Sequence, residues 1–134
     1  MKIRKDFVTN SSSSSFVIAK HQECTTDEIK TMLYGLENRI KELIYDCEGR
    51  FCDCNHMNEI QDAYDNDDMD TAIKYVIEDI MDELVSPHGS PLTLDNWDVY
   101  CARGSSEDSY LFECALYYFG CCMNTEHLKV QERD

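Results

Sequence analysis

Apolar residues recur at steps of three and four between residues 25 and 47, which is the spacing of one face of an α-helix. Thr25 and Glu28 precede this run as a capping box, and Gly49 follows it as a stop signal. The apolar stripe consists of Ile29, Met32, Leu33, Leu36, Ile40, Leu43, Ile44 and Cys47. The pattern predicts one long amphipathic helix that packs this stripe against a core.

A second stripe follows between residues 69 and 84. Asp68 can cap this helix, and Ser86 and Pro87 end it. Its apolar members are Met69, Ala72, Ile73, Val76, Ile77, Ile80 and Leu84. The segment between the two stripes predicts a shorter helix over 57–64 that ends near the turn at 65–67. Three helices are therefore expected in the first two thirds of the chain.

Three other segments have the composition of β-strands. Residues 16–20 begin with three bulky apolar residues, residues 97–103 alternate between apolar and polar positions, and residues 127–132 close the chain. The five serines at 11–15 stand before the first of these segments. We expect the serine run to be a loop that leads into the first strand.

The segment 104–122 allows two interpretations. Gly104, Ser105 and Ser106, followed by Glu107 and Asp108, resemble a capped helix start with acidic residues in its first turn. Helical spacing then relates Leu111, Cys114, Ala115, Tyr118 and Cys122. The aromatic residues of 110–119 would also suit a buried strand. The caps and the period favour the helix.

The resulting order is strand, three helices, strand, helix, strand. This order indicates an α+β or α/β fold with a small sheet of about three strands and three to four helices packed on it. A length of 134 residues suits one core. We expect a serine-rich N-terminal segment over 1–15 and a single domain over 16–134.

The charge of the chain restricts its partners. The 12 Lys and Arg against 27 Asp and Glu give a net charge of −15. Direct binding to nucleic acid or anionic lipid is disfavoured, because both need clustered cations. No apolar run approaches the roughly 20 residues of a membrane span, and no apolar leader segment follows the basic start. We expect a cytoplasmic protein without membrane contact, for which basic proteins remain possible partners.

Four potential zinc ligands, Cys47, Cys52, Cys54 and His56, lie within ten residues of one another. Their spacing departs from that of known zinc knuckles, which pair two cysteines across two to four residues. The eight cysteines have no secretory leader before them, so most should be free thiols. No signature selects a catalytic Cys–His pair, and no phosphate-binding glycine loop is present. The sequence favours a protein that is not an enzyme and has no cofactor, with zinc binding as the alternative.

Residues 59–83 carry ten acidic residues against Lys74, a local balance of −9. Such a surface commonly serves only to keep a small protein solvated. A helix can also present carboxylates at steps of about 5 to 6 Å, a spacing that can stand in for a row of phosphates. The residues that we expect to contact a partner are Asp70, Glu78, Asp79, Asp82 and Glu83.

The start of the chain, KIRKDFVTNSSSSSFVIAK over residues 2–20, resembles an N-terminal signature of diverse small proteins, mostly uncharacterised, from Firmicutes and from their phages and prophages. The apolar pair, Thr9, Asn10, the serine run and Phe16 occur in the order of that signature. The resemblance implies a mobile-element or commensal bacterial setting. It carries over no catalytic residue.

These observations together predict a non-enzymatic accessory protein of phage or prophage type. It would bind another protein through an acidic helical surface. A basic nucleic-acid-binding protein is the kind of partner that such a surface suits, and the chain could then act as an inhibitor that mimics nucleic acid. The alternative is a small zinc-binding domain built on the 47–56 cluster.

Overall fold

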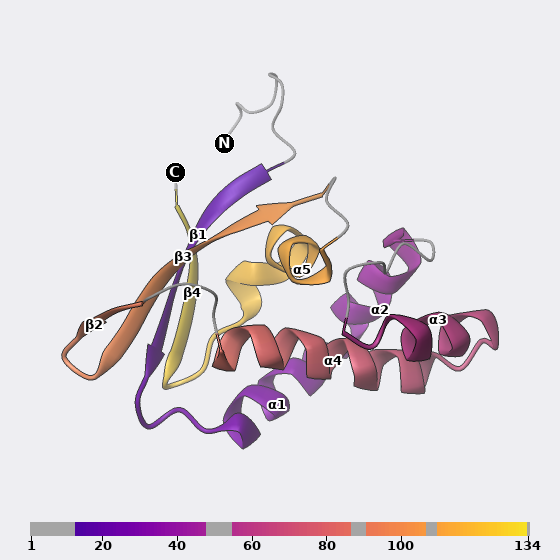
Figure 1. Cartoon of the computed structure of the whole chain (residues 1–134), viewed down its shortest axis with the longest axis horizontal. Helices are drawn as coiled ribbons and strands as arrows, with labels where there is room; N and C mark the ends of the chain where they lie inside the picture. The colour runs from indigo at the N-terminus through magenta and orange to yellow at the C-terminus, as the bar shows by residue number, and fades with distance from the viewer. Residues whose placement is uncertain (1–12, 48–54, 87–90, 107–109, 134) are drawn as a thin grey trace.

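The computed structural model describes residues 13–47, 55–86, 91–106 and 110–133, and these form an α+β fold (Figure 1). The strands are β1 (Ser13–His21), β2 (Leu92–Leu94), β3 (Trp97–Ser105) and β4 (Leu128–Arg133). The helices are α1 (Thr26–Tyr34), α2 (Glu37–Cys47), α3 (Met57–Asp65), α4 (Met69–Val85) and α5 (Leu111–Phe119), with a 3₁₀ turn η1 (Gly120–Cys122). The described residues thus contain one more strand and one more helix than the sequence predicts. No helix among them is both long and apolar enough to cross a membrane.

The four strands form one antiparallel sheet in the order β2-β3-β1-β4. The central strand β1 pairs on both sides, with Phe16 opposite Ala102 of β3 and Glu132 of β4. The strand begins at Ser13, so the last three serines of the run are part of the sheet. The expected loop is therefore wrong for Ser13–Ser15, because pairing with β3 extends the strand beyond its apolar residues.

The sequence analysis missed strand β2. It forms a hairpin with β3 through Asp95 and Asn96, whose φ angles are 50° and 69°. Asp and Asn tolerate this left-handed conformation, and two such residues in succession make a turn that matches the twist of a hairpin. The side chain of Thr93 also donates a hydrogen bond to Asp98 across the pair, at 2.8 Å. The Asp-Asn dipeptide was the signal that the sequence offered for this strand.

The long helix predicted over 25–47 is two helices. The chain turns at Gly35 and Leu36, where the Leu36 amide donates to the carbonyl of Leu33 at 2.9 Å, a tighter bond than the α-helical one. The Leu36 carbonyl then accepts from the Ile40 amide and so begins α2. From Ile29 to Ile44 the residues of the apolar stripe are buried or partly buried on both sides of the break. Periodicity alone could not reveal the change of direction, because both helices keep the same spacing.

The segment after β3 is a helix, as the caps and the period predict, and not a strand. It begins at Leu111, later than expected, because Gly104 and Ser105 still belong to β3. It also ends earlier, since Cys122 lies in η1. Glu107 and Asp108, which were expected to start this helix, lie outside the described residues.

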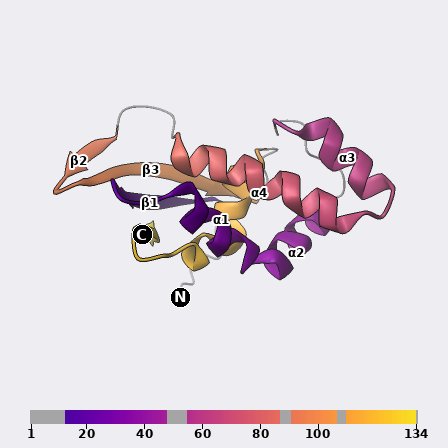
Figure 2. The ribbon, with the colours of Figure 1, turned by 90° about the horizontal axis from the view of Figure 1, so that it is seen from below.

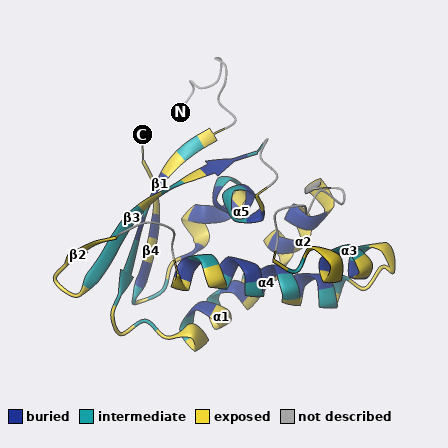
Figure 3. Ribbon diagram, viewed as in Figure 1, coloured by how far each residue is buried: buried dark blue, intermediate teal, exposed yellow. Residues whose placement is uncertain are grey.

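The helices lie on one side of the sheet, as two views at right angles show (Figures 1 and 2). Helix α4 runs through the middle of this layer and contacts α1, α2, α3 and α5. It is buried along most of its length (Figure 3). From the sheet, Phe16 and Ile18 of β1 reach the same core, with 2% and 0% of their surface exposed. The central helix and the central strand therefore share one interior.

The ring of Phe16 fits between two glycines. A Cβ atom on Gly104 would lie 2.7 Å from a ring carbon of Phe16 and 2.9 Å from the backbone nitrogen of Tyr117, and one on Gly120 would lie 3.0 Å from the other side of the ring. Real Cβ atoms essentially never come as close as the two distances at Gly104, and the distance at Gly120 is tighter than most real contacts. The backbone of α5 can therefore lie against β3 only because residue 104 has no side chain.

We predict that Gly104→Ala destabilises the protein by about 1 to 3 kcal/mol, the usual cost of overpacking a tight interior. Urea unfolding followed by circular dichroism measures the change. Ser15→Ala, at an exposed position of β1, is the control and should change the free energy of unfolding little. Equal stability of Gly104→Ala and the native chain would contradict the close approach of α5 to β3.

Candidate functional site

Helices α3 and α4 form an antiparallel pair, in which α3 lies at the end of the molecule far from β2 and α4 extends from that end toward the sheet (Figure 1). Their solvent-facing sides and the turn between them carry mostly carboxylates. We call this the acidic helical surface, and it consists of Glu59, Asp62, Asp65, Asp67, Asp68, Asp70, Glu78 and Asp82. All are exposed except Glu78, which is partly buried. The concentration of acidic residues that the sequence indicated thus lies largely on one structural unit.

On α4 these carboxylates follow a single row. Asp70, Glu78 and Asp82 are separated by multiples of four residues, so they follow one inclined ridge that winds slowly around the helix. Twelve residues of α-helix span roughly 18 Å. Lys74 occupies the remaining place in the row and places its ammonium group over the ring of Tyr75. The row is therefore acidic with one cationic interruption.

The turn before α4 is held by its own acidic residues. Asp67 adopts a left-handed backbone conformation, with φ of 59°, and Asp68 accepts a hydrogen bond from the Thr71 amide, as its predicted role as a cap requires. In α3, Gln61 donates to Asp65 one turn along at 2.9 Å. These local hydrogen bonds hold the turn between α3 and α4, and so they position the carboxylates of that part of the acidic helical surface.

Asp79, which was expected to contact a partner, lies inside the molecule. Only 6% of its surface is exposed. One carboxylate oxygen lies 2.7 Å from Nδ1 of His56, and the other accepts the His56 backbone amide at 3.3 Å. The carboxylate therefore sits at the start of α3, where the helix dipole favours negative charge. Its hydrogen bond raises the pKa of His56 above the ordinary value. Asp79 is a structural partner of His56 and is not available to another protein.

Glu83 also departs from the row. It is partly buried and lines a hollow of about 430 Å³ between α4, β3 and the start of α5, together with Tyr100 and Phe112. The Tyr100 hydroxyl donates to the Leu84 carbonyl at 3.5 Å. Burial, and then the Glu83 carboxylate, raises the pKa of Tyr100. Of the five residues expected to bind a partner, Asp70, Glu78 and Asp82 thus share one row, and Asp79 and Glu83 lie elsewhere.

The structure describes only two of the four candidate zinc ligands. Cys47 ends α2, Cys52 and Cys54 lie outside the described residues, and His56 stands before α3. Nε2 of His56 lies 3.8 Å from a carboxylate oxygen of Glu78. Within the described parts of the chain, no three His, Cys, Asp or Glu residues are grouped so that they could hold a metal ion. The free cysteines among them are Cys24, Cys101, Cys114, Cys121 and Cys122.

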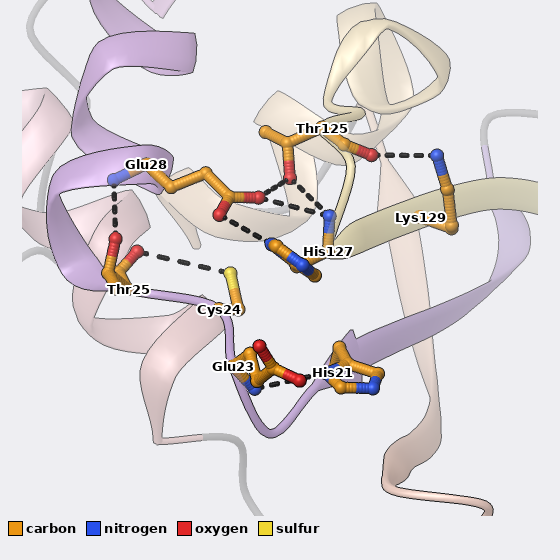
Figure 4. Close-up of polar contacts among 8 residues, drawn as sticks. All are labelled: His21, Glu23, Cys24, Thr25, Glu28, Thr125, His127 and Lys129. Carbon is orange, nitrogen blue, oxygen red and sulfur yellow. Dashed lines mark hydrogen bonds and ion pairs between the residues drawn. The ribbon is translucent and has the colours of Figure 1, made fainter.

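A second polar cluster, which the sequence analysis did not identify, joins α1 to the segment before β4 (Figure 4). One carboxylate oxygen of Glu28 accepts hydrogen bonds from the Thr125 hydroxyl and from the His127 amide, the latter at 3.0 Å. The other oxygen lies 2.9 Å from Nδ1 of His127. Glu28 was expected to complete a capping box. Its amide does bond to the Thr25 hydroxyl at 3.1 Å, but its side chain binds residues almost 100 positions away.

The cluster is suited to holding charge rather than to nucleophilic chemistry. The hydrogen bond to Glu28 raises the pKa of His127, and the bonds from Thr125 and then His127 lower the pKa of Glu28. Cys24 lies four residues before Glu28, and its Sγ lies 3.9 Å from the Thr25 carbonyl. Burial, and then the Glu28 carboxylate, raises the pKa of Cys24, which disfavours the reactive thiolate. The geometry therefore describes an ion pair that fastens α1 to β4.

We predict that Glu28→Gln destabilises the protein most between about pH 4.5 and 6.5. The contribution of Glu28 is present above its unfolded pKa and is lost as the pH falls through the lowered folded pKa. The contribution of His127 is present below its unfolded pKa, about 6.5, and is lost as the pH rises through the raised folded pKa. Urea unfolding of both proteins from pH 4 to 9 measures the difference. A difference that does not change with pH would argue against the ion pair.

Comparisons of the chain with known proteins found no match. No protein-family model matches the chain. No curated protein and no solved structure gives a significant match. The proposals below therefore depend on the contacts and charges of the chain itself.

Proposed function

We propose that this protein is a non-enzymatic accessory protein of phage or prophage type that binds a basic protein through the acidic helical surface. The observation that carries the proposal is the row of Asp70, Glu78 and Asp82 on α4, in which Asp70 and Asp82 are exposed and Glu78 is partly buried, beside the acidic residues of α3. The phage or prophage setting is supported by the resemblance of residues 2–20 alone. Asp79 and Glu83 are not part of the proposed surface.

The physical role of such a surface is to attract and orient its partner. Exposed charges contribute little to affinity individually, but a patch of one sign raises the rate of encounter and selects the orientation of docking. Glu78 and Asp82 stand one helical turn apart, as do Glu59, Asp62 and Asp65 on α3, a spacing that can substitute for phosphates in front of a cationic groove. A basic nucleic-acid-binding protein is the partner class that these features fit, and binding would block its nucleic-acid site.

We predict that the triple change Asp62→Lys, Asp70→Lys and Asp82→Lys lowers the association rate with a fluorescent Lys- and Arg-rich peptide by about tenfold or more, and makes that rate less sensitive to salt. All three side chains are exposed, so the fold should persist. Stopped-flow measurements at several salt concentrations give the rates.

The control carries the same change in net charge at a distant place. Glu23→Lys, Asp27→Lys and Glu126→Lys alter three exposed acidic residues near the start of α1 and before β4. If the acidic helical surface itself attracts the peptide, this control should associate with the peptide at nearly the rate of the native chain. An equal loss in both triple variants would show that only the overall charge matters, and the proposed surface would be rejected.

We infer a second candidate, a zinc site that includes His56, from the way its ring is held. Metal-binding histidines commonly bond one ring nitrogen to a carboxylate, which orients the other nitrogen toward the metal. Asp79 bonds Nδ1 of His56 in this manner. Cys52 and Cys54 precede His56 by four and two residues, and Cys47 is the fourth candidate ligand.

This candidate predicts nearly one zinc ion per chain in protein purified without chelator, measured by elemental analysis. Cys52→Ser and His56→Gln should each lower the zinc content strongly, while Cys121→Ser, at an exposed cysteine of η1, should leave it unchanged. A folded native chain that contains no zinc, even after incubation with zinc salts, would eliminate the candidate.

A further inference from the structure

One face of the sheet has no described helix or strand over it. Strand residues alternate between the two faces, and Phe16 and Ile18 of β1 point toward the helices. Val17 and Ala19 therefore point to the other side, where they are only partly buried. Figure 1 shows the helices together on one side of the strands. We call the side that carries Val17 the outer sheet face.

The centre of the outer sheet face is apolar. By strand register, Leu92 and Leu94 of β2 lie opposite Val99 and Trp97 of β3, so these side chains share a face. Val17 is paired with Cys101 on the same face. Leu92 and Leu94 are 61% and 54% exposed. Such an apolar strip on a sheet of a highly charged protein usually marks a contact surface.

The charges on this face are all positive. The register places Arg103, Lys129 and Arg133 on the outer sheet face, while none of the strand residues that share this face is Asp or Glu. Glu132 and Asp98 occupy alternate positions and point by register to the helix side. The chain has 27 acidic residues, so the strand residues of this face differ clearly from the rest of the chain in having none.

The cations sit beside the apolar strip. A guanidinium nitrogen of Arg133 lies 3.9 Å from Sγ of Cys101, across the intervening strand β1, so this side chain extends over the face. The ammonium group of Lys129 donates to the Thr125 carbonyl at 2.7 Å. Arg103 is paired with Glu113 at 2.8 Å, at the margin of the face. Neither Lys129 nor Arg133 forms an ion pair with a carboxylate of the described residues.

We propose that the outer sheet face docks an amphipathic helix of a partner protein, whose apolar stripe is flanked by Asp and Glu. Helices already pack on the opposite face of this sheet, and a helix on the outer face would complete a three-layer arrangement. Its apolar stripe would cover Leu92, Leu94 and Val99, and its carboxylates would pair with Lys129 and Arg133. The proposal concerns a surface separate from the acidic helical surface and does not depend on it.

The net charge of −15 does not oppose this docking. Charges are screened beyond about 8 Å at physiological salt, and α3 with the start of α4, which carry most of the acidic helical surface, lie far from β2 along the long axis (Figure 1). The local potential of the outer sheet face therefore decides which helix binds. Nucleic acid fits this face less well, because three cations around leucine and valine side chains offer few phosphate contacts and little aromatic surface for stacking bases.

The test is a selection from a displayed library of helical peptides. Each peptide has a fixed leucine stripe, and the flanking positions vary among Asp, Glu, Lys, Arg, Ser and Gln. Peptides that also bind the Leu92→Ser, Leu94→Ser variant are removed, which discards ligands of other surfaces, including the acidic helical surface. The expected survivors are enriched in Asp and Glu at the flanking positions. They should bind the native chain at least tenfold more tightly than that variant.

Two matched variants check the assignment. Lys129→Glu with Arg133→Glu should reverse the preference and select peptides with Lys and Arg flanks. Tyr34→Ser with Tyr45→Ser, which removes exposed apolar side chains from α1 and α2, should leave the affinity of the selected peptides unchanged. Circular dichroism and thermal melting confirm that each variant is folded.

Several results would overturn the proposal. These are a selection without survivors, survivors with basic flanks or with no charge preference, and a preference that persists in the Lys129→Glu, Arg133→Glu variant. Binding of a fluorescent single-stranded oligonucleotide that is lost in the Leu92→Ser, Leu94→Ser variant would assign the face to nucleic acid instead. A dimer seen by light scattering and lost in the same variant would assign it to a second copy of the chain.

Discussion

The burial of α4 among the other helices is the constraint on which the rest of the structure depends. Each fully buried aliphatic side chain contributes about 1.5 to 3 kcal/mol, and α4 supplies many of those in the core. A helix that is covered on most sides leaves only a narrow strip for solvent. The acidic residues of α4 must therefore lie in that strip or be satisfied inside. Asp70 and Asp82 are exposed to solvent, whereas Asp79 is buried and is hydrogen-bonded to His56.

Two histidine–carboxylate pairs fasten parts of the chain that are far apart in sequence. Asp79 holds His56 at the start of α3, and Glu28 holds His127 before β4. Asp79 is buried, so its charge would be costly without His56, whereas Glu28 and His127 are partly exposed and are joined by additional hydrogen bonds through Thr125. The second pair closes the fold, because it joins the first helix to the last strand beside β1.

The fold separates two surfaces of opposite character. The acidic helical surface carries carboxylates, and the outer sheet face carries cations around an apolar strip. A chain with a net charge of −15 therefore presents a local surface whose sign is opposite to its average. The two proposed binding surfaces are therefore physically distinct.

Local pattern by itself determined most of the secondary structure. The 3.6-residue period located the stretch that contains α1 and α2, as well as α3, α4 and α5, and apolar runs located β1, β3 and β4. The same patterns did not show the break at Gly35, because the apolar spacing continues through it. They did not reveal β2 either, since three residues are too few for a periodic signal.

The candidate site shows the same division. The sequence located the acidic stretch, but only packing decided that Asp79 faces His56 and that Glu83 faces Tyr100, because coverage by neighbouring elements distinguishes one side of a helix from another. The Glu28–His127 contact spans 99 positions and leaves no local trace. The outer sheet face required the strand order and register, which bring Leu92, Val17 and Arg133 together from three separate segments. Periodicity is a property of neighbours in sequence, whereas a surface is a property of neighbours in space.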